Sequence, residues 1–347
     1  MIHETKSKTL KSSSDALRGI NSKIPSLQGA TDPFSYVSGQ LQMVEETLAR
    51  AIRSREQTLT DIAAHLIHGG GKRVRPAVTI LAFLAFGGKK ASDIVDIAAA
   101  MELIHTATLL HDDIIDGAET RRGKESAYKK YGLKSTLVAG DFLFIKAFEF
   151  AGKFDETVVQ WTADACAMLT EGEMLQGLFN RNLSVRVDDY IEIVKRKTAS
   201  LFHTGAKVGA YLAGAHPSLI EESERYGLNM GIAFQMVDDI LDVVGHVDLL
   251  GKPTGMDLRD GNPSLPIILA LQEGERAVCE AFENPQPSEQ QIAAALRALQ
   301  TGNSIHEARS ISKRFAEDAV RSVKKFPPSL HRNGLKTLVQ IIIDRDF

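Results

Sequence analysis

Three carboxylates lie close together in the segment LLHDDIIDGAETRRG, residues 109–123. Asp112, Asp113 and Asp116 follow an apolar stretch without Pro or Gly, which predicts a helix. If that helix continues to Asp116, then Asp112 and Asp116 lie on one face, about 6 Å apart along the axis. Such like-charge pairs weaken a helix, and Mg²⁺, which takes oxygen ligands and shares them with phosphates, is a natural compensator. Taken alone, the motif fits a solvated acidic helix end equally well.

A second acidic group has the same spacing. Asp238, Asp239 and Asp242 stand at the end of another apolar stretch, FQMVDDILD. Two D-D-x-x-D groups, each ending an apolar helix, are not easily explained as coincidence. Facing each other across a cavity, they would hold metal ions, and the ions would hold a strongly anionic ligand such as a diphosphate.

Basic residues suited to phosphate oxygens stand in GGGKRVRP, where Lys72, Arg73 and Arg75 follow three glycines. Their order differs from that of a Walker P-loop, so nucleotide hydrolysis is not indicated. Taken alone, this segment is more often a surface turn. Lys197 in VKRKTASLF and Lys252 in LGKPTG, each taken alone, fit a solvated helix face and an exposed loop.

The elements that must position these residues are helices. From Val37 onward, apolar residues recur at helical spacing in almost every segment, and alternation typical of strands is scarce. The connecting segments are short and no linker divides the chain. We therefore expect one all-α domain over residues 33–347, preceded by a disordered polar tail over residues 1–32.

The composition excludes several classes of protein. A net charge of −3 gives no sign of a nucleic-acid binder, and two cysteines in unrelated contexts form neither a metal motif nor a disulfide framework. No apolar run reaches the length of a transmembrane helix. The Ser- and Lys-rich N-terminal segment lacks the apolar core of a signal peptide. We expect a cytoplasmic protein, and an organellar presequence stays an open alternative.

Taken together, the motifs resemble those of the trans-polyprenyl diphosphate synthases, which join isoprene units head to tail. The resemblance runs from about residue 37 to the C-terminus, in family order. GGGKRVRP is similar to the isopentenyl diphosphate motif, and HTATLLHDDIIDGAETRRG to the first aspartate-rich motif. Gly140-Asp141, GEMLQ, Lys197-Thr198, FQMVDDILD and GKPTGMDLRDGNPSLP complete the set.

This resemblance implies a single large helical bundle with a central cavity, and an enzyme that condenses isopentenyl diphosphate with an allylic diphosphate. Several Mg²⁺ ions are implied as cofactors, with ligands Asp112, Asp113, Asp116, Asp238, Asp239 and Asp242. The implied contacts to the allylic diphosphate are Arg121, Lys197 and Lys252. Those to isopentenyl diphosphate are Lys72, Arg75, His105 and Arg122. The implied catalytic residues are Lys197, Arg121, Thr198 and Gln235, the last two with oxygens near the reacting carbons.

Three residues leave alternatives open. The family often has Lys where this chain has Asn262, so one cation of the allylic site is replaced by a neutral hydrogen-bonding group. From the residues alone, His105 is equally well a buried core histidine. Gln176 in GEMLQ either supports the first acidic motif or has a structural role.

The resemblance also implies partners. We expect a homodimer without nucleic acid, with transient membrane contact when a hydrophobic product is released. A terpene cyclase would lack both the second acidic motif and GGGKRVRP. A non-catalytic subunit of a heteromeric synthase tends to lose one acidic motif, whereas both are intact here.

The product length is predicted from residues just before Asp112. Ala107 and Thr108 stand where short-chain members tend to carry aromatic rings. This resembles the long-chain, octaprenyl-type branch and predicts a product longer than C20. We expect Phe144 or Phe148 to close the far end of the tunnel.

Overall fold

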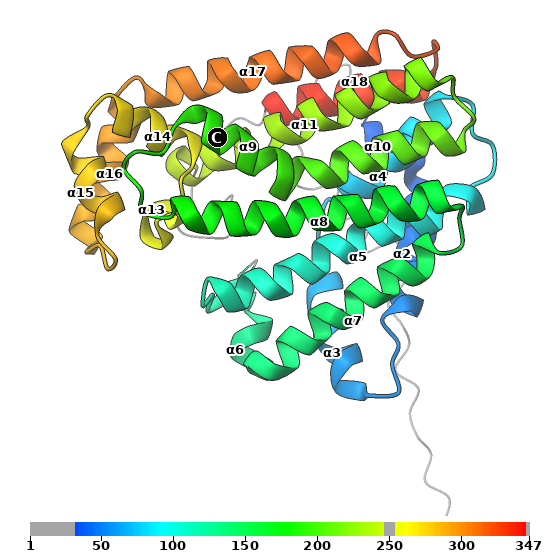
Figure 1. The fold of residues 1–347 in the computed structure, drawn as a ribbon, viewed down its shortest axis with the longest axis horizontal. Coiled ribbons are helices and arrows are strands. Elements are labelled where there is room, and N and C mark those ends of the chain that lie inside the picture. Colours follow the sequence, from blue (N-terminus) through cyan, green and yellow to red (C-terminus); the bar gives the residue numbers. More distant parts are fainter. Residues whose placement is uncertain (1–31, 122, 246–253, 345–347) are drawn as a thin grey trace, which may run out of the picture. The chain divides into compact units, whose positions relative to one another are not determined.

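The structure, a computed structural model, describes residues 32–121, 123–245 and 254–344. This part of the chain is almost entirely helical, which confirms the expected all-α fold (Figure 1). Its first half contains η1 (Pro33–Val37), α2 (Ser38–Ala51), α3 (Gln57–Ile67), α4 (Val74–Ala85), α5 (Ser92–Ile115), β1 (Thr120–Arg121), β2 (Lys124–Glu125), α6 (Ala127–Tyr131), α7 (Leu133–Ala151) and α8 (Glu156–Phe179). Its second half contains α9 (Val187–Val194), η2 (Lys195–Ala199), α10 (Ser200–Leu212), α11 (Pro217–Val244), α13 (Met256–Asp260), α14 (Leu265–Gln272), α15 (Arg276–Glu283), α16 (Glu289–Thr301), α17 (Ser304–Val323) and α18 (Leu330–Ile343).

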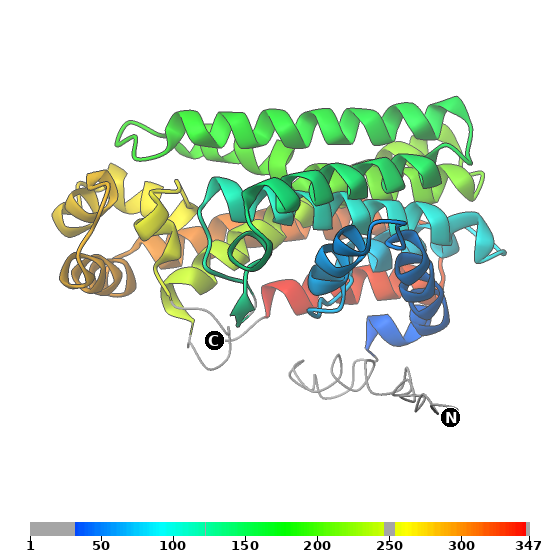
Figure 2. The same ribbon diagram turned by 90° about the horizontal axis from the view of Figure 1, so that it is seen from below.

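Four helices form the centre of this bundle. α10 packs against α4 and α11, and α5 packs against α4 on one side and α7 on another. α11 packs in turn against α17. In Figure 1, α17 lies along one edge of the bundle, beyond α11, and α7 lies toward the opposite edge beside α5. Figure 2 shows α8 along another edge, and α18 packs against α4, α17 and α11. The helices carrying the two acidic motifs, α5 and α11, are therefore held from several sides.

The apolar character of α5 corrects one expectation. By length and composition this helix is apolar enough to cross a membrane, although no transmembrane stretch was expected from the sequence. In the structure 72% of its most apolar window is buried inside the protein. Its apolar residues therefore serve as core of the bundle, which explains why they extend around the helix instead of along one stripe.

Two glycines allow helices to approach the acidic end of α5. A Cβ atom on Gly140 of α7 would lie 2.1 Å from Nε2 of His111, the residue before Asp112. A Cβ atom on Gly172 of α8 would lie 2.5 Å from the backbone nitrogen of Lys197. Because real Cβ atoms do not approach other atoms so closely, a side chain at Gly172 would push α8 away from the backbone of Lys197, and a side chain at Gly140 would displace the His111 ring.

A local irregularity interrupts the helical run of residues 187–212. The sequence pattern predicts one continuous helix here, but residues Lys195–Ala199 form a π-helical turn, η2, between α9 and α10. Single π-turns inside α-helices are rare and occur frequently at functional sites. The turn contains Lys197 and Thr198, both of which the sequence assigned to the site.

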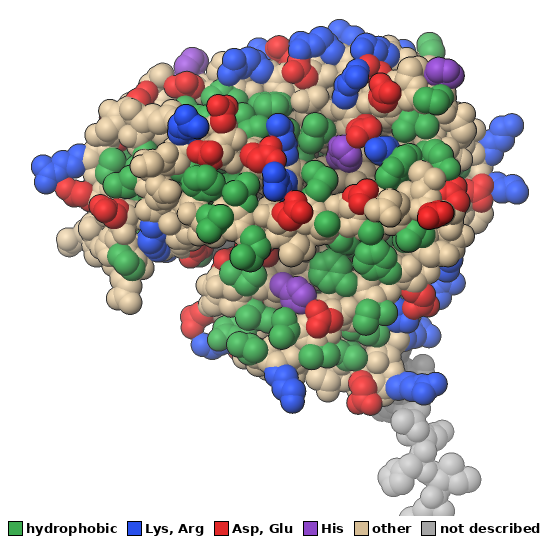
Figure 3. All heavy atoms as spheres, viewed as in Figure 1, with side chains coloured by type: hydrophobic (Ala, Val, Ile, Leu, Met, Phe, Trp, Pro, Cys, Tyr) green, Lys and Arg blue, Asp and Glu red, His purple; other side chains and the backbone are tan. Residues whose placement is uncertain are grey.

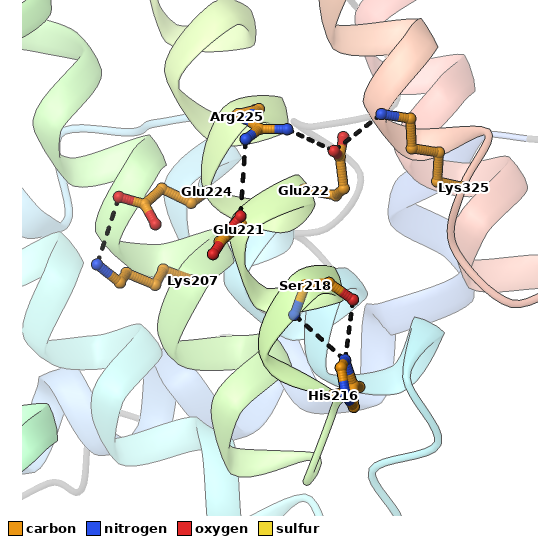
Figure 4. Close-up of polar contacts among 8 residues, drawn as sticks. All are labelled: Lys207, His216, Ser218, Glu221, Glu222, Glu224, Arg225 and Lys325. Atoms are coloured by element: carbon orange, nitrogen blue, oxygen red, sulfur yellow. Dashed lines mark hydrogen bonds and ion pairs between the residues drawn. The ribbon is translucent and has the colours of Figure 1, made fainter.

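The other end of α11 is fixed by ion pairs (Figure 4). Glu222 accepts from Lys325 at 2.8 Å and from Arg225 at 2.6 Å, and Lys207 of α10 lies 3.3 Å from Glu224. From Glu222 to Asp238 is about 24 Å along the helix axis. This network therefore holds α10, α11 and the end of α17 together at a distance from the acidic motifs.

Candidate active site

Both acidic motifs lie at the C-terminal ends of long helices. Asp112 and Asp113 are in the last turn of α5, and Asp116 caps it. The second motif occupies the last two turns of α11, which ends at Val244. The C-terminal end of a helix carries the negative pole of its macrodipole, so carboxylates there are electrostatically unfavourable. Both motifs thus concentrate negative potential that a cation would relieve.

Asp112 shows the electrostatic cost of placing a carboxylate in this negative potential. Its side chain is half-buried, and burial raises its pKa from 3.8 to about 7, with further increases from Glu173 and Asp116. Lys197 and Arg121 lower the pKa of Asp112 but do not outweigh these effects. In the metal-free protein this carboxylate is therefore held in an environment that disfavours its charge.

Asp113 forms an ion pair with Arg121 inside the protein. It is fully buried, and its Oδ1 accepts from Arg121 Nε at 2.7 Å and lies 2.6 Å from Arg121 Nη2. Its Oδ2 has no hydrogen-bond partner in the described ranges. Arg121 stands on the short β1–β2 pair that follows α5, where Thr120 faces Glu125. The Asp113–Arg121 ion pair therefore holds the β1–β2 strands against the end of α5, and 31% of the Arg121 side chain stays exposed.

Lys197 connects the π-turn to the first acidic motif. It forms an ion pair with Glu173 of α8. Burial alone would lower the pKa of Lys197, but Asp112 and Glu173 outweigh it and raise this pKa above its ordinary value. Lys197 is therefore a firmly protonated, partly desolvated cation beside Asp112. Sequence analysis did not single out Glu173, which lies in GEMLQ. The residue before it, Gly172, is the glycine whose missing side chain leaves room for the π-turn.

Thr198 and Gln235 are brought into direct contact. The Thr198 hydroxyl donates to Gln235 Oε1 at 2.9 Å, and Gln235 Nε2 donates to Asp239 Oδ1 at 2.8 Å. Asp239 Oδ2 accepts from the Tyr190 hydroxyl at 2.6 Å and from the Leu265 backbone nitrogen at 3.3 Å. Burial raises the pKa of Asp239 to about 6, and these hydrogen bonds oppose the rise. Nothing in the sequence distinguished Tyr190 from other core residues of α9.

A further carboxylate, which sequence analysis missed, connects the two acidic motifs. Burial raises the pKa of Asp260, at the end of α13, to about 6, and the charges of Asp116 and Asp242 add to this rise. Asp242 belongs to the second motif, and its Oδ2 accepts from the backbone nitrogen of Asp257 at 3.1 Å. Both motifs therefore face the same region, and the surface is hollowed between the lobe containing α13 and the part containing α6 (Figure 3).

Asn262 is held by α8. Gln176 Nε2 donates to Asn262 Oδ1 at 3.0 Å, which gives Gln176 a contact with the segment after the second acidic motif. The amide N–H groups of Asn262 are the donors that it can offer to an anion. Behind it, Arg181 in a left-handed conformation (φ 56°) donates to the Arg259 carbonyl at 2.7 Å.

The three cations of GGGKRVRP have different environments. Arg73, in a left-handed conformation (φ 48°), is buried and ion-paired with Glu45 and, at 2.8 Å, with Glu102. The Arg73 guanidinium is therefore committed to these two carboxylates, which agrees with its absence from the residues assigned to isopentenyl diphosphate. The Arg75 guanidinium lies over the Phe202 ring, 4.8 Å from its centre.

The remaining predicted residues are less closely defined. Lys72 is exposed ahead of α4, and His105 is half-buried on α5. Phe148 is 37% exposed, and the Phe144 ring lies 5.9 Å from that of His111, near the acidic end of α5, so the closing of the tunnel by either ring stays a prediction. Arg122 and Lys252 lie outside the described residues.

The carboxylate set fits a divalent cation that arrives with a phosphate ligand. Across residues 32–121, 123–245 and 254–344, no three His, Cys, Asp or Glu side chains are grouped tightly enough to hold a metal by themselves. Mg²⁺ sites that bind substrate phosphates typically use one or two carboxylates and take their other oxygens from substrate and water. The raised pKa of Asp112 and the helix poles beneath both motifs indicate where such cations would bind.

A helical bundle with two aspartate-rich helix ends around one opening, and a half-buried lysine beside them, defines the class of helical isoprenoid synthases. The chain belongs to the polyprenyl synthetase family, whose model matches residues 56–299. It is a prenyltransferase of the trans-polyprenyl diphosphate synthase type, a family that acts on isoprenoid diphosphates with a divalent metal.

Three similar proteins illustrate the relationship. The heptaprenyl diphosphate synthase component 2 of Geobacillus stearothermophilus is 32% identical, over 90% of this chain and 98% of its own. The octaprenyl diphosphate synthase of Escherichia coli is 32% identical, over 87% and 95%. The polyprenyl synthase of Caulobacter crescentus, crystallised with calcium and isoprenyl diphosphate, is 32% identical with a TM-score of 0.87, over 92% and 99%.

Proposed function

We propose that the two acidic motifs hold Mg²⁺ ions around the diphosphate of an allylic substrate, and that the chain condenses this substrate with isopentenyl diphosphate. The observation that carries the proposal is the convergence of both motifs, through Asp260, on one region that also contains Lys197. The similar Caulobacter protein, crystallised with calcium and isoprenyl diphosphate, supports it.

We assign to Lys197 and Arg121 the main role in stabilising the negative charge that develops on the departing diphosphate. The bound metal ions would supply Lewis-acid stabilisation of the departing diphosphate. Lys197, protonated and partly desolvated beside Asp112, adds a fixed positive charge on the same leaving group. Arg121, which keeps an exposed portion while paired with Asp113, can contact the diphosphate from the other side. The buried helices around the site exclude water that would otherwise capture the allylic cation.

The second substrate uses a separate set of residues. We assign the diphosphate of isopentenyl diphosphate to Lys72, which precedes α4, to Arg75 on α4 and to His105 on α5. Arg122 and Lys252 keep their predicted roles at the two diphosphates. Because the chemistry adds a carbon–carbon bond and releases a proton and diphosphate, it needs no protein nucleophile.

The test is an assay of the purified chain alone. With an allylic diphosphate, isopentenyl diphosphate and Mg²⁺, we expect all-trans products longer than C20, detected by chromatography after dephosphorylation. EDTA should abolish turnover and Mg²⁺ should restore it. Full activity in chelator would contradict the metal assignment, and a cyclised hydrocarbon product would indicate a terpene cyclase.

A second copy of the chain is the partner that we propose. α7 exposes Leu137, Val138 and Ile145, and α8 exposes Met174 and Leu178, between 44% and 74% of each side chain. These helices lie on the face in Figure 3, where hydrophobic side chains gather. An exposed apolar area of this kind typically marks an interface. Ile145→Arg should convert a dimer to a monomer in sedimentation, and a wild-type monomer would refute the proposal.

One relative raises a different possibility for the partner. The Geobacillus protein is called component 2 of its synthase, so a second polypeptide belongs to that enzyme. Both acidic motifs are intact in this chain, which favours activity without such a polypeptide. The assay of the chain alone separates the two cases, because a component that needs a partner would make no product.

Two further predictions concern the surroundings of the enzyme. We propose transient membrane contact during product release, because a chain of more than twenty carbons is poorly soluble. Phospholipid vesicles should then raise the steady-state rate but not the first turnover. A cytoplasmic location stays a prediction, to be tested by fractionation.

A further inference from the structure

Asp239 is surrounded by donors on both of its oxygens. The Tyr190 hydroxyl at 2.6 Å and the Leu265 backbone nitrogen reach Oδ2, and Gln235 Nε2 reaches Oδ1 at 2.8 Å. Its side chain is buried, with 6% of the residue exposed, and Tyr190 is 2% exposed. An ionised carboxylate offers only acceptor sites, so every group in contact with it must donate. Asp239 is therefore tied into the protein on several sides.

This arrangement fixes the direction of the neighbouring amide. A glutamine amide has a donor end and an acceptor end that can exchange by rotation. Because Asp239 only accepts, Gln235 must turn its NH₂ group toward it, and its Oε1 then faces Thr198. The Thr198 hydroxyl donates to that oxygen at 2.9 Å. Its single proton is thus committed to Gln235, and only its lone pairs remain for other groups.

We infer that Tyr190 and Asp239 are positioning residues for prenyl transfer: by fixing Gln235, they make Thr198 a pure hydrogen-bond acceptor toward the substrate. An oxygen with only lone pairs to offer stabilises an electron-deficient carbon, whereas a hydroxyl free to donate would turn its proton toward the leaving diphosphate. The inference rests on the proposed function, since it assigns a role within that reaction. It gives Asp239 a task besides the predicted metal coordination.

The proposal distinguishes Tyr190 from an ordinary buried tyrosine. Tyr226 of α11 provides the matched control, because it is fully buried and its hydroxyl donates to the Leu335 carbonyl at 3.0 Å, in α18. Tyr190→Phe and Tyr226→Phe each delete one buried hydroxyl and its hydrogen bond. Only Tyr190 is connected to Thr198 by hydrogen bonds, by way of Asp239 and Gln235.

The experiment compares rates of single-turnover condensation. Tyr190→Phe should slow this step by about tenfold to a hundredfold, the scale of a misplaced catalytic group, with the KM for isopentenyl diphosphate unchanged. Calorimetric binding of Mg²⁺ with inorganic diphosphate is measured alongside, because Tyr190 donates to Asp239, a predicted metal ligand. The loss of rate should persist at saturating Mg²⁺, and a rate restored by excess Mg²⁺ would assign the effect to metal affinity and overturn the inference. Tyr226→Phe should lose comparable thermal stability and keep its rate.

A double-mutant cycle tests the path itself. If Tyr190 acts through Thr198, then Tyr190→Phe added to Thr198→Val should slow the reaction no further than Thr198→Val alone. Multiplicative effects, or equal rate losses in the Tyr190 and Tyr226 variants, would overturn the inference. Should Tyr190→Phe not fold, Asp239→Asn at saturating Mg²⁺ is the second test: with its oxygen facing the Leu265 N–H, its NH₂ group faces Gln235 and reverses that amide. An unchanged rate would overturn the inference. Failure of the wild type to condense the two diphosphates would instead refute the proposed function.

Discussion

Replacing Asp112 by Asn should stabilise the metal-free protein while removing its activity. The wild-type carboxylate must be ionised to bind Mg²⁺, yet burial, Glu173 and Asp116 together raise its pKa to about 7. Asn has the same shape without the charge. The substitution therefore removes an electrostatic cost that only a bound cation can offset in the wild type.

The size of this effect follows from the pKa of Asp112. In the unfolded chain the pKa returns to its ordinary value of 3.8, whereas in the folded protein it is about 7. A folded pKa above the unfolded one means that stability falls as the pH rises from about 4 to about 7, and then levels off. With about 1.4 kcal/mol for each pKa unit, the cost to the wild type is about 1.5 kcal/mol at pH 5 and about 4 kcal/mol at pH 8. Solvent screening of this half-buried group makes both values upper limits.

Urea unfolding in EDTA at pH 5 and pH 8 measures this difference. Asp112→Asn should be more stable than the wild type at both values, with the larger gain at pH 8. Asp164→Asn on α8, where an exposed aspartate accepts from Gln160 at 2.8 Å, is the control and should change stability by less than about 0.5 kcal/mol. An Asp112→Asn protein that is less stable than the wild type at pH 8 would refute the electrostatic reasoning and assign this residue a structural role.

Four further outcomes are expected. Lys72→Ala should raise the KM for isopentenyl diphosphate, and Lys197→Ala should lower kcat, each by about tenfold or more; equal effects on both parameters would contradict the two-site assignment. Ala107→Phe, at a fully buried position on α5, should shorten the products toward C15 or C20 in chromatography. Asn262→Lys should lower the KM for the allylic diphosphate by restoring a cation, and an unchanged value would mean that Asn262 does not face it. Glu222→Gln should lower the free energy of unfolding by about 1–3 kcal/mol and leave the rate unchanged.

Sequence reasoning succeeded where periodicity and spacing carry the information. Apolar residues at helical spacing predicted the bundle, and the identical spacing of the two aspartate motifs predicted paired helix ends. It failed where a residue's role depends on what packs against it from another helix. Asp113 and Asp239 occupy the same place in their motifs, yet one pairs with Arg121 and the other accepts from Tyr190.

The same limit explains the other differences. Arg73 differs from Lys72 in the sequence only by being one residue later, but its left-handed backbone turns its guanidinium into the core, toward Glu102. The π-turn has no sequence pattern of its own, because its five residues lie within an otherwise ordinary helical run. It depends on Gly172 of α8, on a different helix, which lets the two backbones come close.

The placement of the two acidic motifs on the ends of separate helices, α5 and α11, has a consequence for how ligands assemble. If the protein supplies too few oxygens to hold Mg²⁺ alone, the metal and the diphosphate must each complete the binding site of the other. Linkage then requires that diphosphate increase the affinity for Mg²⁺ by the same factor by which Mg²⁺ increases the affinity for diphosphate. The protein without substrate should therefore hold Mg²⁺ only weakly, and the metal should leave together with the released diphosphate. Cooperative assembly of this kind frees the acidic helix ends at the close of each elongation cycle, so that the longer chain can rebind with new ions.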